Sequence, residues 1–363
     1  MTGVTGSKRV SMRSVAGAAL VAAAVLAAGP VPAATQGLLY VASQEDVSVA
    51  VIDMATNTLV RTVDLKALGY SETAKAHHVA VEPDGSYWYV SLIAAGKVLK
   101  FDRDDRLVGE ADFETPGMLG LDPTSDRLYV GRSMAAVNPP QRVGVVDRVT
   151  MEIEEVDVFF PRPHAMGVDP LGKRFFSASL GQNSVAYGIL GAEEVDLLPL
   201  EGDHHMLVQF AVSADGRWMV AGGQMSGELL VFDLSGDEPE VVRSVHVGGQ
   251  PWHPTFTPDG SSVWVPNQSA NTVTIVDTDR WEIDEVISHP ALVEPHGSAV
   301  SPDGRTIYVS GHNLSGAYHP AGGGDGRPGT VVAIDADSRE IVAVIEVGRY
   351  AAGMSAPTGT AGR

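Results

Sequence analysis

The chain has 363 residues and no cysteine, which excludes disulfides, iron–sulfur clusters, thiolate metal sites and cysteine nucleophiles. Its 45 acidic and 25 basic residues give a formal net charge of −20 at pH 7, which argues against nucleic acid and anionic membranes as partners. A chain of this length is large enough to bury an extensive core without covalent cross-links.

The first 33 residues are predicted to be a signal peptide and not part of the fold. Basic residues between Lys8 and Arg13 precede an Ala- and Val-rich run of about 15 residues, which is short for a membrane span. Pro30 ends this run, and small residues then occupy the positions expected before a cleavage site at Ala33. We therefore expect export to the periplasm or the medium, with no membrane span in the mature protein; an uncleaved anchor is the alternative.

Residues 38–66 predict three short strands. Apolar and polar residues alternate along this segment and many are β-branched, which is typical of β-strands. The segment matches the second, third and fourth strands of the repeat that follows it, but no first strand precedes it.

A repeat then runs through the chain from residue 77 onward. A turn of the Pro-Asp-Gly type recurs at spacings of 40, 47, 44, 44 and 44 residues, which is the blade period of a β-propeller. The first residues of these turns are Pro83, Pro123, Pro170, Ala214, Pro258 and Pro302. Each repeat predicts four strands, with a hairpin turn after the first and a polar loop after the second.

The C-terminal residues 350–359 resemble a first strand with nothing after it. This strand and the three strands of residues 38–66 together make one complete blade. The sequence therefore predicts an all-β, seven-bladed propeller over residues 34–363, closed by a blade that both ends of the chain share.

Residues 263–287 (VWVPNQSANTVTIVDTDRWEIDEVI) carry a family resemblance, which residues 38–60 echo. They resemble the YVTN-repeat, or YncE-like, propellers. The resemblance implies the fold and leaves the chemistry open, because similar propellers include surface-layer proteins, nucleic-acid-binding proteins, lactonases and the heavy chain of methylamine dehydrogenase. The haem d1 domain of cytochrome cd1 and the copper-cluster domain of nitrous oxide reductase share the architecture as well.

Histidines recur at one place in the repeat. Counted back from the first residue of the turn, His77, His164 and His296 lie six positions upstream, and His78 and His253 lie five positions upstream. In a propeller these positions are at the start of the innermost strands, which ring one mouth of the central channel.

Four more histidines are expected at the same mouth. His204 and His205 lie slightly further upstream in their repeat, and the long insertion of residues 311–329 carries His312 and His319. The two histidines expected elsewhere are His246 and His289.

Several imidazoles that converge without cysteine suit copper or another metal that prefers nitrogen ligands, so copper is the candidate cofactor. The candidate metal ligands are His77, His78, His164, His204, His205, His253, His296 and His312. Asp203 is positioned to orient one ring as a hydrogen-bond acceptor. Thioethers suit Cu(I), although Met more often fills apolar space; the methionines near the strand starts are Met118, Met206 and Met354.

The tandem His77-His78, followed by single histidines in later blades, resembles the histidine arrangement of the nitrous oxide reductase propeller. The cupredoxin domain of that enzyme and its cysteine ligands are absent from this sequence. The resemblance therefore implies an analogous site and not the same enzyme.

Two interpretations of the histidines remain open at this point. They bind a metal or cofactor, or they are structural and hydrogen-bond to the neighbouring blade in the channel wall. A shift of one residue turns a strand side chain to the opposite face, so residues six and five before the turn need not converge.

The function is open in the same way. The first hypothesis is a monomeric binding or scaffold protein outside the cytoplasm, with a small molecule, a metal or a protein at the channel mouth. The alternatives are a metal- or haem-dependent oxidoreductase or accessory protein, and a lactonase or lyase. No residue is assigned a catalytic role.

Overall fold

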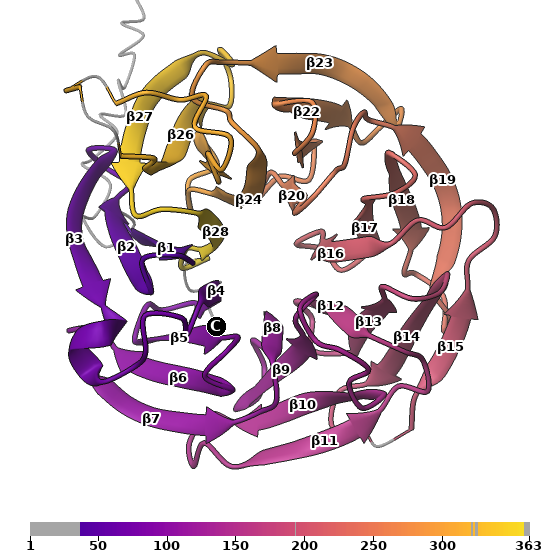
Figure 1. Ribbon diagram of the computed structural model, residues 1–363. Helices are drawn as coiled ribbons and strands as arrows, with labels where there is room; N and C mark the ends of the chain where they lie inside the picture. Colours follow the sequence, from indigo (N-terminus) through magenta and orange to yellow (C-terminus); the bar gives the residue numbers. More distant parts are fainter. Residues whose placement is uncertain (1–36, 193, 321, 324–325, 359–363) are drawn as a thin grey trace, which may run out of the picture. The chain divides into compact units, whose positions relative to one another are not determined.

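The computed structural model describes residues 37–192, 194–320, 322–323 and 326–358. The predicted signal peptide, residues 1–33, lies outside the described residues. Within them, seven antiparallel sheets of four strands each form a ring around a central channel (Figure 1). The predicted all-β, seven-bladed propeller is confirmed.

The blades are numbered here in chain order, and their strands are given from the innermost outward. Blade 1 consists of β28 (Ala351–Ser355), β1 (Leu38–Ser43), β2 (Ser48–Asp53) and β3 (Thr58–Asp64). Blade 2 consists of β4 (Ala76–Val81), β5 (Tyr87–Leu92), β6 (Lys97–Asp102) and β7 (Leu107–Asp112). Blade 3 consists of β8 (Pro116–Leu121), β9 (Arg127–Arg132), β10 (Arg142–Asp147) and β11 (Ile153–Asp157).

The remaining blades follow the same order. Blade 4 consists of β12 (Pro163–Val168), β13 (Arg174–Ser179), β14 (Ser184–Ile189) and β15 (Asp196–Pro199). Blade 5 consists of β16 (Leu207–Val212), β17 (Trp218–Gly223), β18 (Glu228–Asp233) and β19 (Glu240–His246). Blade 6 consists of β20 (Thr255–Phe256), β21 (Ser262–Asn267), β22 (Thr272–Asp277) and β23 (Glu282–Ser288). Blade 7 consists of β24 (Pro295–Val300), β25 (Thr306–Gly311), β26 (Gly329–Asp335) and β27 (Ile341–Val347).

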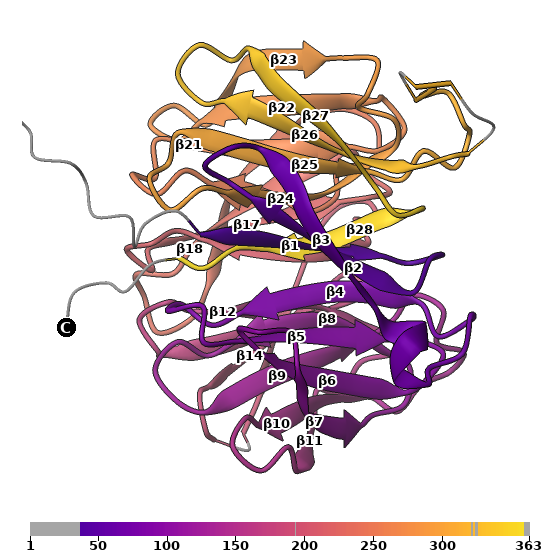
Figure 2. The ribbon, with the colours of Figure 1, turned by 90° about the vertical axis from the view of Figure 1, so that its left-hand side faces the viewer.

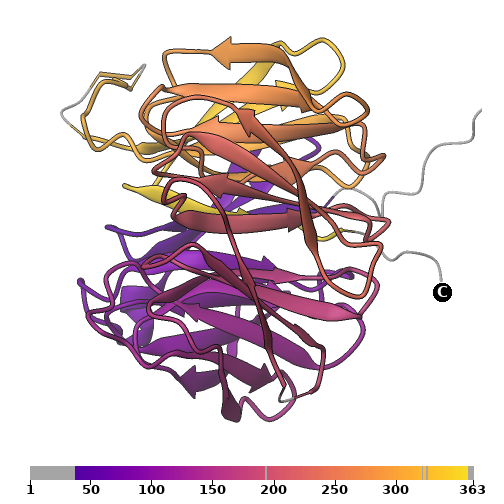
Figure 3. The same ribbon diagram turned by 90° about the vertical axis from the view of Figure 1, so that its right-hand side faces the viewer.

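Among the described residues the one helical element is η2 (Leu65–Leu68), a short 3-10 turn between blades 1 and 2. No helix in the described part of the chain is long and apolar enough to cross a membrane. The segment after β25 extends from one face of the ring, on the right in Figure 2 and on the left in Figure 3. In Figure 2, η2 lies on that same side.

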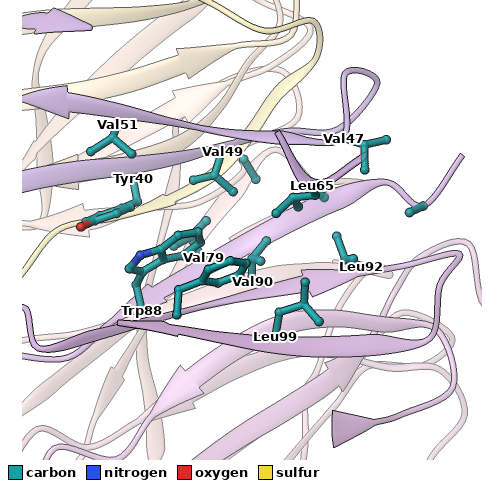
Figure 4. Packing of buried hydrophobic residues seen from close by; sticks show 14 of the residues in the cluster. Tyr40, Val47, Val49, Val51, Leu65, Val79, Trp88, Val90, Leu92 and Leu99 are labelled. Atoms are coloured by element: carbon teal, nitrogen blue, oxygen red, sulfur yellow. The ribbon is translucent and has the colours of Figure 1, made fainter. Parts of the chain in front are cut away.

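The core consists of apolar layers between neighbouring blades. Between blades 1 and 2, the indole of Trp88 packs 5.1 Å from the ring of Tyr40 and stacks 4.1 Å from Phe101, measured between centroids (Figure 4). Burial of one such large side chain stabilises the fold by roughly 1.5–3 kcal/mol. The second strand of each blade is almost wholly buried and the third strand is half or more buried, whereas an outermost strand such as β3 is largely exposed.

The shared blade is also confirmed. Strand β28 pairs antiparallel with β1, and Val41 lies opposite Met354 (Figure 2). Because β28 covers the inner edge of β1, this contact closes the ring without leaving an unpaired edge at the join.

Candidate functional site

Each innermost strand begins with an irregularity in its pairing. In six blades the register between the innermost and second strands shifts at this point. Blade 6 has the same feature, since Pro251 pairs with Asn267 whereas Thr255 pairs with Trp264. Such a β-bulge places an extra residue on one strand and turns its side chains away from strict alternation.

A second irregularity comes directly before each bulge. One residue per blade has a left-handed backbone, with φ between 48° and 60°, although none of the seven is glycine. These residues are Lys75, Thr115, Arg162, Met206, Gln250, Glu294 and Tyr350. Strain of this kind costs on the order of 1–3 kcal/mol per residue and gathers at functional sites.

The bulges, together with the segment after β25, bring six of the predicted histidines together at one end of the channel. This histidine cluster consists of His77, His78, His164, His253, His296 and His312. The ring centroid of His77 lies 6.4 Å from that of His164 and 6.1 Å from that of His296, and His78 lies 5.7 Å from His253. His77 and His78 both belong to the bulge of β4, so the residues six and five before the turn do converge.

Two further aromatic side chains belong to the same packing. The ring of His296 lies 4.3 Å from His253, 4.5 Å from His312 and 4.3 Å from the indole of Trp252. Tyr350, which precedes β28, lies 3.8 Å from His312. With these two side chains, the cluster is a continuous series of tilted and edge-on aromatic rings from blades 1, 2, 4, 6 and 7.

In several of these rings one nitrogen is hydrogen-bonded to the protein and the second ring nitrogen has no partner among the described residues. Nδ1 of His77 donates to Oε1 of Gln44 at 3.1 Å, and Nδ1 of His164 donates to the carbonyl oxygen of Arg132 at 2.7 Å. Both acceptors require the hydrogen on Nδ1, so Nε2 of each ring carries an unshared lone pair. This arrangement is the one that orients metal-ligating histidines.

His78 has the opposite tautomer. Its Nδ1 accepts the backbone N–H of Leu119 at 3.3 Å, so the hydrogen of the neutral ring is on Nε2. Nδ1 of His312 lies 3.3 Å from the side-chain Nε2 of Gln268. His78 therefore presents a hydrogen-bond donor at the free end of its ring, whereas His77 and His164 present acceptors.

The free ring nitrogens are buried. Among the described residues, no hydrogen-bond partner reaches Nε2 of His77, His164, His253 and His312, Nδ1 of His296, or Nε1 of Trp252. An unpaired buried polar group costs about 1–3 kcal/mol, and six at one place are far more than a folded protein normally retains.

Burial lowers the pKa of every ring in the histidine cluster. The pKa falls to about 3 for His78 and His312. It falls to about 4 for His164, because burial outweighs the opposing hydrogen bond to the carbonyl of Arg132. Burial followed by repulsion from the neighbouring imidazoles brings His77, His253 and His296 well below their usual pKa. All six rings are therefore neutral at pH 7.

Glycine makes room for this packing. A Cβ on Gly353 in β28 would lie 2.4 Å from Cδ2 of His78 and 2.9 Å from the carbonyl oxygen of His77. The closing strand of blade 1 thus approaches the cluster more closely than any side chain would allow.

His204 and His205 lie apart from the cluster. His204 is exposed. His205 is buried, but its Nδ1 bonds Ser226 Oγ at 3.0 Å and its Nε2 bonds the carbonyl of Glu201 at 3.1 Å. Both ring nitrogens are hydrogen-bonded, so His205 links the segments that contain Glu201 and Ser226 and has no free lone pair.

The other predicted residues are also placed. His246 pairs with Glu228 on the surface, and His289 caps a turn by accepting the backbone N–H of Ala291. The exposed residues are Asp203 and His319. Two of the three predicted methionines, Met118 and Met354, pack in apolar clusters between blades.

The sequence did not single out Trp252, Gln44, Gln268 or Tyr350. Trp252 occupies the same position in its repeat as His77, six residues before Pro258, so the repeat itself could have identified it. The two glutamines follow the second strands of blades 1 and 6, and no sequence pattern pairs them with histidines of other blades.

The arrangement has two further properties. Among the described residues, no three His, Asp or Glu side chains stand ready to hold a single metal ion. No Asp or Glu side chain in the described part of the chain hydrogen-bonds to any ring of the histidine cluster. The site is therefore a cluster of neutral rings whose unpaired atoms are nitrogens, and these nitrogens do not converge on one point.

Comparison with known proteins establishes the fold. A functionally unknown protein from Desulfotomaculum acetoxidans DSM 771 is similar with a TM-score of 0.70 at 11% sequence identity, over 89% of this chain and 99% of that chain. Kuenenia stuttgartiensis hydrazine synthase is similar with a TM-score of 0.59 at 20% identity, over 76% of this chain and 87% of that one. The dihydro-heme d1 dehydrogenase NirN, solved in complex with DHE, is similar with a TM-score of 0.58 at 15% identity, over 88% of this chain and 75% of that one.

No protein-family model and no curated protein matches the sequence. At 20% identity or less, the solved structures show the architecture alone, and two of the three belong to enzymes. This chain is accordingly a seven-bladed β-propeller with a buried histidine cluster at one end of its channel.

Proposed function

We propose that the protein is an exported propeller of the YVTN-repeat type whose histidine cluster binds copper at one mouth of the channel. The observation that carries the proposal is the set of buried ring nitrogens without partners. Structural histidines would be expected to use both ring nitrogens, as His205 does.

The donor set favours copper over harder metals. Neutral imidazole is a ligand for copper, zinc and iron, whereas Mg²⁺ and Ca²⁺ prefer several oxygen donors, and in the described part of the chain the unpaired atoms of this cluster are all nitrogens. In the described part of the chain no carboxylate hydrogen-bonds to the rings to offset the charge of a bound ion, so a monovalent ion costs less to bury than a divalent one. Cu(I) meets both conditions.

The spacing of the rings is compatible with an ion between them. The free nitrogens are closed to solvent, and the closest ring centroids are 4.3–4.5 Å apart. A metal–nitrogen bond is only about 2 Å long, so modest rotation of the rings would bring several lone pairs to one ion. His77 and His164 are the first ligands in this proposal, because Gln44 and the carbonyl of Arg132 already orient them.

Copper titration followed by thermal unfolding tests the proposal. Wild-type protein is expected to gain stability with added Cu(I) at pH 7.5, because a ligand that binds the native state raises the free energy of unfolding. The double variant His77→Ala, His164→Ala should lose this gain. The matched control replaces the two histidines outside the cluster, His246→Ala and His289→Ala, and should keep it.

Other outcomes of this experiment would support one of the other functions. If the double variant is less stable but copper never stabilises the wild type, the histidines are structural and the mouth is a scaffold or recognition surface. If metal-free protein hydrolyses lactones, the enzymatic alternative replaces the copper proposal.

A further inference from the structure

We propose that Met134, Met206 and Trp252 form a separate site for a soft monovalent metal ion at the channel mouth, through which the ion reaches the histidine cluster. The site itself is independent of the proposed function, and only the passage of the ion to the histidine cluster rests on it. The ion class is Cu(I), with Ag(I) as its redox-inert equivalent.

The three side chains share one small apolar cluster. Trp252 is buried together with Leu180 and Val208, and Met134 and Met206 pack against them while remaining partly exposed. The two methionines come from different blades, since Met134 follows β9 and Met206 precedes β16. The contact is therefore made by the fold and not by neighbours in sequence.

The backbone fixes both methionines at the mouth. Nη2 of Arg162 donates to the carbonyl of Met134 at 3.1 Å, and Arg162 lies two residues before His164. Met206 is the left-handed residue at the start of β16, with φ of 54°, and its carbonyl accepts the backbone N–H of Gln224 at 3.1 Å. Met206 is therefore held in a strained conformation at the same ring of positions from which the cluster begins.

The chemistry of these groups selects soft ions. Thioether sulfur is a neutral, polarizable ligand that binds Cu(I) and has little affinity for hard divalent ions. An indole face adds attraction for a monovalent cation. Trp252 also stacks on His296 at 4.3 Å, so an ion held by the methionines would be one side chain away from the histidine cluster.

Titration with silver nitrate in chloride-free buffer tests the site. The variant Met134→Leu, Met206→Leu keeps apolar volume and removes both thioethers. We expect its affinity for Ag(I) to fall at least tenfold, and its rate of Cu(I) uptake to fall while the final copper content stays at the wild-type level. The matched control, Met151→Leu with Met219→Leu, changes two buried methionines of the blade interfaces and should behave as wild type.

The outcomes separate this inference from the copper proposal. The variant His77→Ala, His164→Ala should lose copper but keep a site for Ag(I) that the methionine variant lacks. If the variant His77→Ala, His164→Ala keeps as much copper as the wild type while the methionine variant loses its affinity for Ag(I), the histidine proposal fails and the methionine site stands. If the methionine variant and the wild type bind Ag(I) equally, or neither binds it, the methionine site is refuted.

Discussion

Acidification should unfold this protein at an unusually high pH, because its histidine cluster is buried in the neutral form. In the unfolded chain each ring takes up a proton near its ordinary pKa of about 6.5. In the folded protein the pKa is about 3 for His78 and His312 and about 4 for His164. A lowered histidine pKa gives stability that is fully present above pH 6.5 and is lost as the pH falls towards the folded value.

The size of the effect follows from these three rings. Each loses up to about 1.4 kcal/mol of stabilisation per pH unit, or about 1.6 kcal/mol between pH 6.5, where the unfolded ring is half protonated, and pH 5. Three rings together lose about 5 kcal/mol, which is comparable to the whole stability of a typical domain, about 5–15 kcal/mol. The pKa values of His77, His253 and His296 are lowered in the same direction and add to the loss.

Urea unfolding at pH 8, 7, 6 and 5, followed by tryptophan fluorescence and circular dichroism, measures this dependence. The free energy of unfolding should be nearly constant from pH 8 to 7 and should fall steeply from pH 6 to 5. Replacing His164 by Gln should reduce the dependence of the unfolding free energy on pH by about one proton. A free energy of unfolding that stays constant from pH 7 to pH 5 would refute the view that these rings are buried and neutral.

Three further predictions concern closure, export and packing. Deleting the chain from Tyr350 onward removes β28 and exposes the inner edge of β1, so size-exclusion chromatography should find aggregate in place of folded monomer. Mature protein from its host should begin near Ala34 by mass spectrometry, and a soluble product that retains the initiator methionine would contradict export. Gly353→Ala should lower the free energy of unfolding by about 1–3 kcal/mol because its Cβ would meet His78, whereas Gly322→Ala, with no described atom within 4 Å, should change it by less than about 0.5 kcal/mol.

The fold was predictable because the same physical pattern is repeated in every blade. The alternating residues of β22 and the Pro-Asp-Gly turns each carry a local signal, and six copies of that signal reinforce one another. The shared blade was predictable for the same reason, since residues 38–66 lacked the one strand that the C-terminus supplies.

The site was predictable only in part. The positions of His77, His164 and His296 in the repeat placed them at the channel mouth, but strict strand alternation left the direction of His78 and His253 undecided. The bulge that resolves this is an irregularity of the backbone, stabilised by contacts between blades, and it has no residue signature of its own.

His205 shows why proximity in sequence was a poor guide. It lies just ahead of β16, as His164 lies at the start of β12, but it precedes the left-handed residue Met206 and so turns towards Ser226 and away from the channel. Gln44, in contrast, reaches His77 from another blade, and only the closed ring brings the two together.

The metal content of the protein purified from its host tests copper binding most directly. Protein recovered from copper-replete cells of its host and analysed by inductively coupled plasma mass spectrometry should contain copper in stoichiometric amount, and the variant His77→Ala, His164→Ala should contain none. Folded wild-type protein without copper, or a variant with as much copper as the wild type, would contradict the proposal that the histidine cluster is a copper site.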